Sequence, residues 1–168
     1  MSEELSGSVY EKYVESALEY EKDRKASLEQ RGVAVVTSSA VLVTLIFGFA
    51  TFAAGKGNID PGPAPRTLLA VGLAGFLVAI LFGLSVSHPL SKHYEPVAVA
   101  SLKQAVDAAN WDRFSATEAA RRVSEIRVEH IDAWRDGNGR KAMRLYVAGI
   151  LQGVSVVLVA SAAIVVIV

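Results

Sequence analysis

Three long apolar runs without a charged residue dominate the pattern of hydrophobic and polar positions along the chain. They cover residues 32–54, 67–87 and 145–168, which are 23, 21 and 24 residues long. A helix rises about 1.5 Å per residue, so about 20 apolar residues cross the hydrocarbon core of a bilayer. Surface helices of a water-soluble domain keep a polar face, which these runs lack. The pattern therefore predicts transmembrane helices at residues 32–54, 67–88 and 145–168.

The polar residues before the first run have a helical period. Apolar side chains recur at three- and four-residue spacing from Leu5 to Leu18, and charged side chains fill most other positions. We expect residues 1–31 to form an amphipathic cytoplasmic helix. It should lead directly into the first span, with Gly32 as the weakest point of the junction.

The two remaining polar segments differ in length and composition. Residues 55–66 hold three prolines within five positions, which excludes a helix there and predicts a short external turn between antiparallel spans. Residues 89–144 should form a helical cytoplasmic segment, in which Pro96 suits a first helical turn and Ser115-Ala-Thr-Glu118 has the form of a capping box. The sequence Gly137-Asn-Gly139 is expected to end the last helix of this segment.

The distribution of Lys and Arg predicts an orientation for this all-α membrane protein. Five of these residues precede the first span, two lie in residues 55–66, and ten lie in residues 89–144. Cytoplasmic loops carry an excess of Lys and Arg. We therefore expect a cytoplasmic N-terminus, a helical cytoplasmic segment between spans two and three, and an external C-terminus.

The composition excludes several kinds of chemistry. There is no cysteine, hence no disulfide, thiolate metal site or cysteine nucleophile, and the zero net charge predicts no nucleic-acid partner by itself. The three histidines lack the spacing of a metal site, and neither a G-x-S-x-G motif nor a phosphate loop is present. We expect no enzyme, no metal and no cofactor. The uncharged spans argue against an ion-coupled transporter and are compatible with a passive pore.

Hydroxyl side chains recur every seven residues in the first span. Thr37, Thr44 and Thr51 stack on one face, because seven residues make almost two helical turns, and Val41 and Gly48 share that side. This face is the candidate pore lining, and apolar Val41 would close it by dewetting. The alternative is helix–helix contact, since Thr in a span also bonds to its own or a neighbouring helix.

Small residues form rows in the second and third spans that suit close helix packing. The expected packing residues are Gly75, Ala79, Gly83, Gly149, Gln152 and Gly153. Gln152 is the one amide or acidic side chain within the three runs, and burying it without a partner is costly. It should face protein or water, either as a helix contact or as a pore or gate position.

Basic side chains in the second polar block offer a candidate binding surface. Arg121, Arg122 and Arg127 are the residues expected to contact an anionic nucleotide or a lipid head group. Acidic residues such as Glu118 and Glu125 are interleaved with them, which is equally typical of a solvated helix face.

Three segments of the chain carry a resemblance. They are E-K-D-R-K-A-S-L-E-Q-R-G at residues 21–32, the short turn at 55–66, and R-R-V-S-E-I-R-V-E-H-I-D-A-W at 121–134. Their layout resembles the SLATT-type small membrane effectors of bacterial anti-phage systems, with the Pycsar membrane effectors as relatives in layout. The third span departs from a simple two-span plan. The resemblance implies an oligomeric pore in the bacterial inner membrane that disrupts the membrane and halts growth of the infected cell.

The expected partners follow from the same considerations. Three spans are too few to enclose an aqueous path, so we expect a homo-oligomer in membrane lipid, with a tetramer favoured. The chain carries no nucleotide-sensing domain. A nucleotide or oligonucleotide ligand, or a separate sensor protein, is therefore expected at the cytoplasmic helices. The alternative is a non-conducting membrane scaffold or accessory subunit that binds a protein partner.

Overall fold

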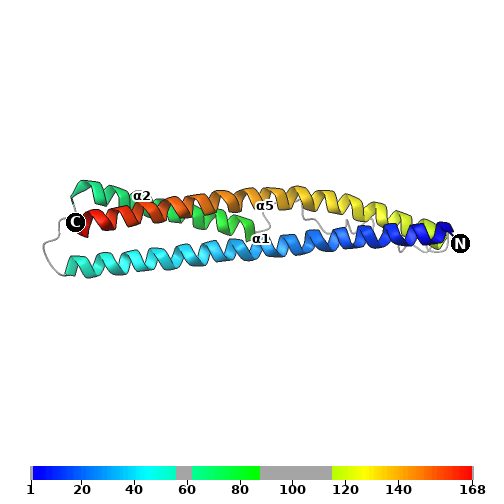
Figure 1. Ribbon diagram of the computed structural model, residues 1–168, viewed down its shortest axis with the longest axis horizontal. Helices are drawn as coiled ribbons and strands as arrows, with labels where there is room; N and C mark the ends of the chain where they lie inside the picture. Colours follow the sequence, from blue (N-terminus) through cyan, green and yellow to red (C-terminus); the bar gives the residue numbers. More distant parts are fainter. Residues whose placement is uncertain (1, 56–61, 88–114, 168) are drawn as a thin grey trace. The chain divides into compact units, whose positions relative to one another are not determined.

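The computed structural model describes residues 2–55, 62–87 and 115–167, and their regular structure is entirely helical. The helices are α1 (Ser2–Gly55), α2 (Pro63–Ser87) and α5 (Ala116–Ile167), as Figure 1 shows. Each is long and apolar enough to cross a membrane. For the described residues, the prediction of an all-helical protein with three helices able to span a membrane is therefore confirmed.

The chain divides into two compact units. The first comprises Met1–Ser27 and Pro89–Arg140, and the second comprises Leu28–His88 and Lys141–Val168. Both α1 and α5 contribute residues to each unit without a break in the helix. The change from polar to apolar sequence is therefore not marked by a helix end in either case.

A side-chain cap begins α5 where the sequence predicts it. The backbone N–H of Glu118 donates to Ser115 Oγ at 3.3 Å, and the N–H of Ala119 donates to the Ser115 carbonyl at 2.9 Å. The first N–H groups of a helix have no intrahelical acceptor, so such a cap stabilises the helix start. The helix predicted from Pro96, with the rest of residues 88–114, lies outside the described residues.

The beginning of α2 corrects the expectation that prolines exclude a helix from the turn. Pro63 and Pro65 both lie in the first turn of α2. Their missing N–H groups would have no intrahelical acceptor at this position, and the fixed φ of proline suits a helix start. Gly62, immediately before the helix, has a φ of 68°, a left-handed conformation that glycine adopts without strain.

The predicted helix end at residues 137–139 is also wrong, because α5 continues through them. Gly137 and Asn138 are buried within the first unit. The Asn138 side chain donates to Glu21 of α1 instead of capping a helix end. Each glycine costs a helix about 1 kcal/mol relative to alanine, and here the contact with α1 offsets that cost.

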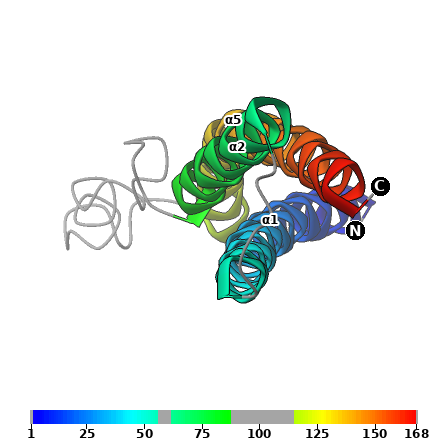
Figure 2. The same ribbon diagram turned by 90° about the vertical axis from the view of Figure 1, so that its left-hand side faces the viewer.

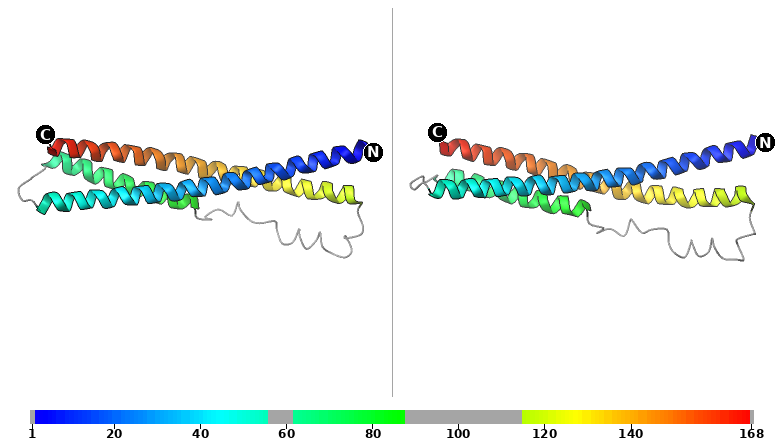
Figure 3. Two further views of the ribbon diagram at one scale, coloured as in Figure 1. Left: turned by 60° about the horizontal axis from the view of Figure 1, so that its bottom comes forward. Right: turned by 90° about the horizontal axis from the view of Figure 1, so that it is seen from below.

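In the second unit α2 lies alongside the apolar parts of α1 and α5 (Figures 1 and 3). From Gly72 onward, the buried positions of α2 are separated by four, three, four and three residues. They are Pro65, Gly72, Phe76, Ala79, Gly83 and Val86. This spacing keeps one face turned toward the neighbouring helices. On α5 the buried residues Ala148, Ser155 and Ala162 recur every seven positions.

Glycines bring α2 close to α1. A Cβ atom added to Gly83 would lie 3.0 Å from the carbonyl oxygen of Gly32 and 2.9 Å from Val36 Cγ2. A Cβ atom on Gly32 would likewise lie 3.2 Å from Val86 Cβ. The start of the first span thus meets the end of the second, so the two helices are antiparallel, as predicted.

Glycines also bring α2 close to α5, further along the same helix. A Cβ atom on Gly75 would clash with Ser155 Oγ, and one on Gly72 would lie 2.8 Å from Val159 Cγ2. Figure 2 views the three helices from one end. The span bundle is therefore held by small residues that let backbones approach, the packing expected where lipid removes the hydrophobic drive.

Candidate functional site

The predicted pore lining is an exposed face of α1. Thr37, Val41, Thr44, Gly48 and Thr51 are all exposed, and a Cβ atom on Gly48 would meet no atom within 4 Å. Neither α2 nor α5 covers this face within the chain. The face is therefore available to lipid, water or another copy of the protein.

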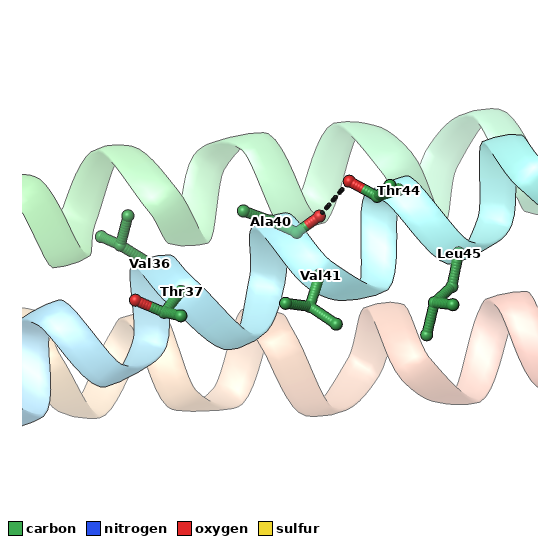
Figure 4. Close-up of a pocket in the computed structure, with 6 residues that line it drawn as sticks. All are labelled: Val36, Thr37, Ala40, Val41, Thr44 and Leu45. Carbon is green, nitrogen blue, oxygen red and sulfur yellow. Dashed lines mark hydrogen bonds between the residues drawn. The ribbon is translucent and has the colours of Figure 1, made fainter.

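A shallow groove runs along this part of α1 (Figure 4). Its lining consists of Val36, Thr37, Ala40, Val41, Thr44 and Leu45. The Thr44 hydroxyl donates to the Ala40 carbonyl at 2.9 Å, and the Thr51 hydroxyl donates to the Phe47 carbonyl at 2.8 Å. Each hydroxyl oxygen keeps acceptor capacity toward a water molecule or a neighbouring helix.

Gln152 forms a polar bridge between two spans. Its Nε2 donates to Ser38 Oγ at 2.7 Å, and the Ser38 hydroxyl donates to the Ala34 carbonyl at 2.8 Å. The amide thus has the protein partner that its position in an apolar run requires. The neighbouring Ser39 is fully buried, and its hydroxyl has no hydrogen-bond partner among the described residues.

The small residues of the second and third spans have different surroundings. Gly75, Ala79 and Gly83 pack against the other helices of the second unit, as the preceding section describes. Gly149 and Gly153 are exposed, and a Cβ atom at either position would meet nothing within 4 Å. A packing role for these two glycines, if it exists, is toward another molecule, and it stays a prediction.

Two cations of α5 make specific contacts at the end of the bundle. Lys141 is 5% exposed and pairs with Glu29 of α1. Arg144 donates from Nη1 to the Ser85 carbonyl at 3.2 Å, near the last turn of α2. A cation there satisfies a carbonyl that lacks an intrahelical donor and interacts favourably with the helix dipole.

A buried carboxylate joins α1 to α5 in the first unit, where Figure 3 shows the two helices side by side. Glu21 is 2% exposed. Arg135 Nε donates to its Oε1 at 3.0 Å, and Asn138 Nδ2 donates to its Oε2 at 2.9 Å and to its carbonyl at 3.0 Å. Burial raises the pKa of Glu21, but the hydrogen bonds from Asn138 and Arg135 and the charge of Arg24 outweigh it, so the pKa lies below its usual value.

The three arginines predicted to bind an anion do not share one face of α5. A helix turns about 100° per residue, which spreads Arg121, Arg122 and Arg127 around its axis. Arg121 pairs with Glu125 at 3.1 Å, and both side chains are exposed. Arg127 is partly buried, and its Nη1 has no hydrogen-bond partner in the described part of the chain. Anion binding here stays a prediction.

Sequence reasoning missed the polar pairs that connect α1 to α5. Glu21 and Asn138 are 117 residues apart, and Lys141 and Glu29 are 112 apart. The only available signal was a charged or amide side chain at a position that continues the apolar period of its helix.

No protein-family model, curated protein or solved structure matches the chain.

Proposed function

We propose that the protein is a homo-oligomeric membrane effector whose copies form an ion-conducting or membrane-disrupting pore lined by α1. One observation carries this proposal. The face with three threonines at seven-residue spacing is left open by α2 and α5, although these helices contact α1 elsewhere.

Physical considerations support a ring of several copies. Three packed helices enclose no aqueous path, whereas a closed ring of identical subunits surrounds its axis with the same face of each. The threonine oxygens on this face accept hydrogen bonds from water. Val41, 53% exposed on the same face, would close the path by dewetting in the resting state. A tetramer is the favoured assembly.

The orientation and setting belong to the same proposal. The excess of Lys and Arg before the first span and in residues 89–144 supports a cytoplasmic N-terminus and an external C-terminus in a bacterial inner membrane. The layout resemblance supports a role in anti-phage defence. Gating then requires a nucleotide-type ligand or sensor protein that binds the open state more tightly than the closed state, with Arg121, Arg122 and Arg127 as candidate contacts.

Planar-bilayer recording of the purified protein tests the pore. Thr44→Val should lower the conductance, and Thr44→Asp should shift the selectivity toward cations. Thr67→Val on α2 is the matched control, since the Thr67 hydroxyl also donates to a carbonyl of its own helix, that of Pro63, at 2.9 Å. Thr67→Val should conduct like the parent protein; if both Thr44 variants do so as well, α1 does not line the path.

A non-conducting scaffold or accessory subunit is the second candidate function. The hydroxyls of Thr44 and Thr51 already donate to carbonyls of their own helix, so they tolerate lipid without any water-filled path. A bilayer that stays electrically silent at all protein densities, together with a stable complex with a cytoplasmic protein, would favour this function.

A further inference from the structure

The polar part of α1 presents an exposed line of one valine, two tyrosines and a serine, which we call the α1 stripe. It consists of Val9, Tyr13, Ser16 and Tyr20, separated by four, three and four residues. Val9 is 63% exposed, Tyr13 is 72% exposed and Tyr20 is 65% exposed. Aromatic side chains exposed in such a line mark an interaction surface, because tyrosine is enriched at protein interfaces.

The stripe lies on the side of α1 that faces away from α5. In the first unit Glu21 is bonded to Arg135 and Asn138 of α5, and Val14 and Leu18, on the same side of α1 as Glu21, are partly buried. These positions differ from the stripe by about 150° around the helix, given 3.6 residues per turn. The contacts that build the first unit therefore leave the α1 stripe open.

The corresponding outer line of α5 is different. It is occupied mainly by charged, exposed residues, namely Glu118, Arg122, Glu125, Glu129, Asp132 and Asp136. Such a line is stable in water without a partner. The apolar line on α1 is not a general property of the outer surface of this unit.

We infer that the α1 stripe binds the same stripe of a second copy of this chain, as a parallel, in-register coiled coil. This rests on the homo-oligomer of the proposed function but not on conduction. Copies inserted into a membrane with one orientation have parallel α1 helices. The alternating spacing of three and four residues is the heptad spacing by which parallel helices pack.

One pair of opposite charges on the flank favours a second copy as the occupant. In a parallel coiled coil, a residue just before one seam position pairs with the residue five positions later in the partner. This rule places Glu19 of one copy against Arg24 of the other. Glu19 is exposed, and the Arg24 side chain, which lies 3.6 Å from Glu21 Oε2 of its own chain, is still 39% exposed. Asp23 occupies the next seam position, where like charges would meet, so the apolar contact ends at Tyr20.

The register connects this contact to the proposed lining. Counted along the sequence of α1 in the same steps of four and three, the line passes through Ser27 and Ala34 and reaches Thr37, Val41 and Thr44. The described residues on this count from Val9 to Thr51 are all exposed. The threonines of the span therefore lie at sequence positions that continue the spacing of the α1 stripe.

Cysteine cross-linking of the full chain in native membranes tests the inference, and the absence of natural cysteine makes single substitutions specific. Ser16→Cys and Tyr20→Cys should yield disulfide-linked dimer on mild copper-phenanthroline oxidation. Glu15→Cys, equally exposed but off the stripe, should yield several-fold less. Dimer from the three variants to the same extent, or none from either stripe position, would overturn the inference.

A charge reversal tests the pairing that selects the second copy. In the Ser16→Cys background, Glu19→Lys should lower the dimer yield several-fold, whereas Glu15→Lys should leave it unchanged. Equal yields from the two would show that the flanking charges do not position the contact. Dimer at Ser16→Cys in a protein that never conducts would refute the pore and retain the stripe contact. Conduction without this dimer would refute the stripe contact and retain the pore.

Discussion

Glu21 shows how a single residue can fix the pairing of two helices. A buried carboxylate is stable only when its oxygens accept hydrogen bonds, and here one oxygen accepts from Arg135 and the other from Asn138. The second Asn138 bond, to the Glu21 carbonyl, ties the backbone of α1 to the same side chain. Sliding α5 by one turn along α1 would break these bonds together, so they define the register of the first unit.

The lowered pKa of Glu21 predicts how the first unit responds to acid. The stabilisation is fully present above the pKa of the unfolded chain, about 4.3, and is lost as the pH falls through the lower folded value. Glu21→Gln should destabilise this unit by about 1–3 kcal/mol at pH 7 and flatten the acid dependence. Hydrogen exchange of α1 amides in detergent micelles between pH 7 and about 3 measures both.

The matched control for this prediction is Glu125→Gln. Glu125 also pairs with an arginine, Arg121, but both side chains are exposed. Exposed pairs contribute about 0–1 kcal/mol, so this variant should exchange like the parent protein across the pH range. An acid dependence that survives Glu21→Gln unchanged would mean that other carboxylates control it.

At the scale of helices, composition determines which segments can span a membrane, and packing determines where the helices begin and end. Bilayer thickness makes a charge-free run of more than 20 residues a span, which is why three spans were predictable from the sequence. The end expected at residues 137–139 failed because a glycine signals either a helix end or a close contact, and only the neighbouring helix distinguishes them. The expectation that Pro63 and Pro65 exclude a helix was wrong for a similar reason, because proline breaks a helix interior but suits a first helical turn.

The packing row of α2 was predictable, but its partners were not. Gly75 and Gly83 were expected to lie at helix contacts from the small-residue spacing alone. The structure divides them: Gly83 contacts Gly32 of α1, and Gly75 contacts Ser155 of α5. A single sequence has no signal that pairs residues this far apart. For the same reason, the hydrogen bond between Gln152 and Ser38 could not be predicted.

The contact between Gly75 and Ser155 leads to a prediction in which a second substitution should reverse the effect of the first. In Gly75→Ala the new Cβ would clash with Ser155 Oγ but would lie an ordinary 3.5 Å from Ser155 Cβ. The substitution should destabilise the bundle by about 1–3 kcal/mol through overpacking. Adding Ser155→Ala removes the clashing oxygen and should restore most of that loss. Thermal unfolding in detergent, followed by circular dichroism, measures the three proteins.

Gly149→Ala serves as the control, because a Cβ atom there would meet nothing within 4 Å. Alanine favours a helix over glycine by about 1 kcal/mol, so this variant should be as stable as the parent or slightly more stable. If Gly75→Ala is equally harmless, or Ser155→Ala gives no rescue, the close approach of α2 to α5 at this point is wrong.

For the molecule as a whole, the division of charge predicts an orientation in the membrane. Fifteen of the 17 Lys and Arg residues lie in the segments before the first span and between the second and third. Placing them outside would oppose the insertion bias that acts on loops of this length. The pair of buried Lys141 with partly exposed Glu29 shows that one of these cations also has a structural role, so the orientation is predicted from all 17 together.

The proposed orientation predicts opposite labelling of two single-cysteine variants of this cysteine-free chain. In intact cells a membrane-impermeant maleimide should label Asn58→Cys, which lies in the sequence between α1 and α2, and not Ala119→Cys, an exposed position near the start of α5. Permeabilising the cells should make Ala119→Cys react as fully as Asn58→Cys, which controls for accessibility. Labelling of Ala119→Cys in intact cells, with Asn58→Cys protected until permeabilisation, would invert the topology. The polar part of α1 and the α1 stripe would then lie outside, where a cytoplasmic ligand or sensor could not reach them.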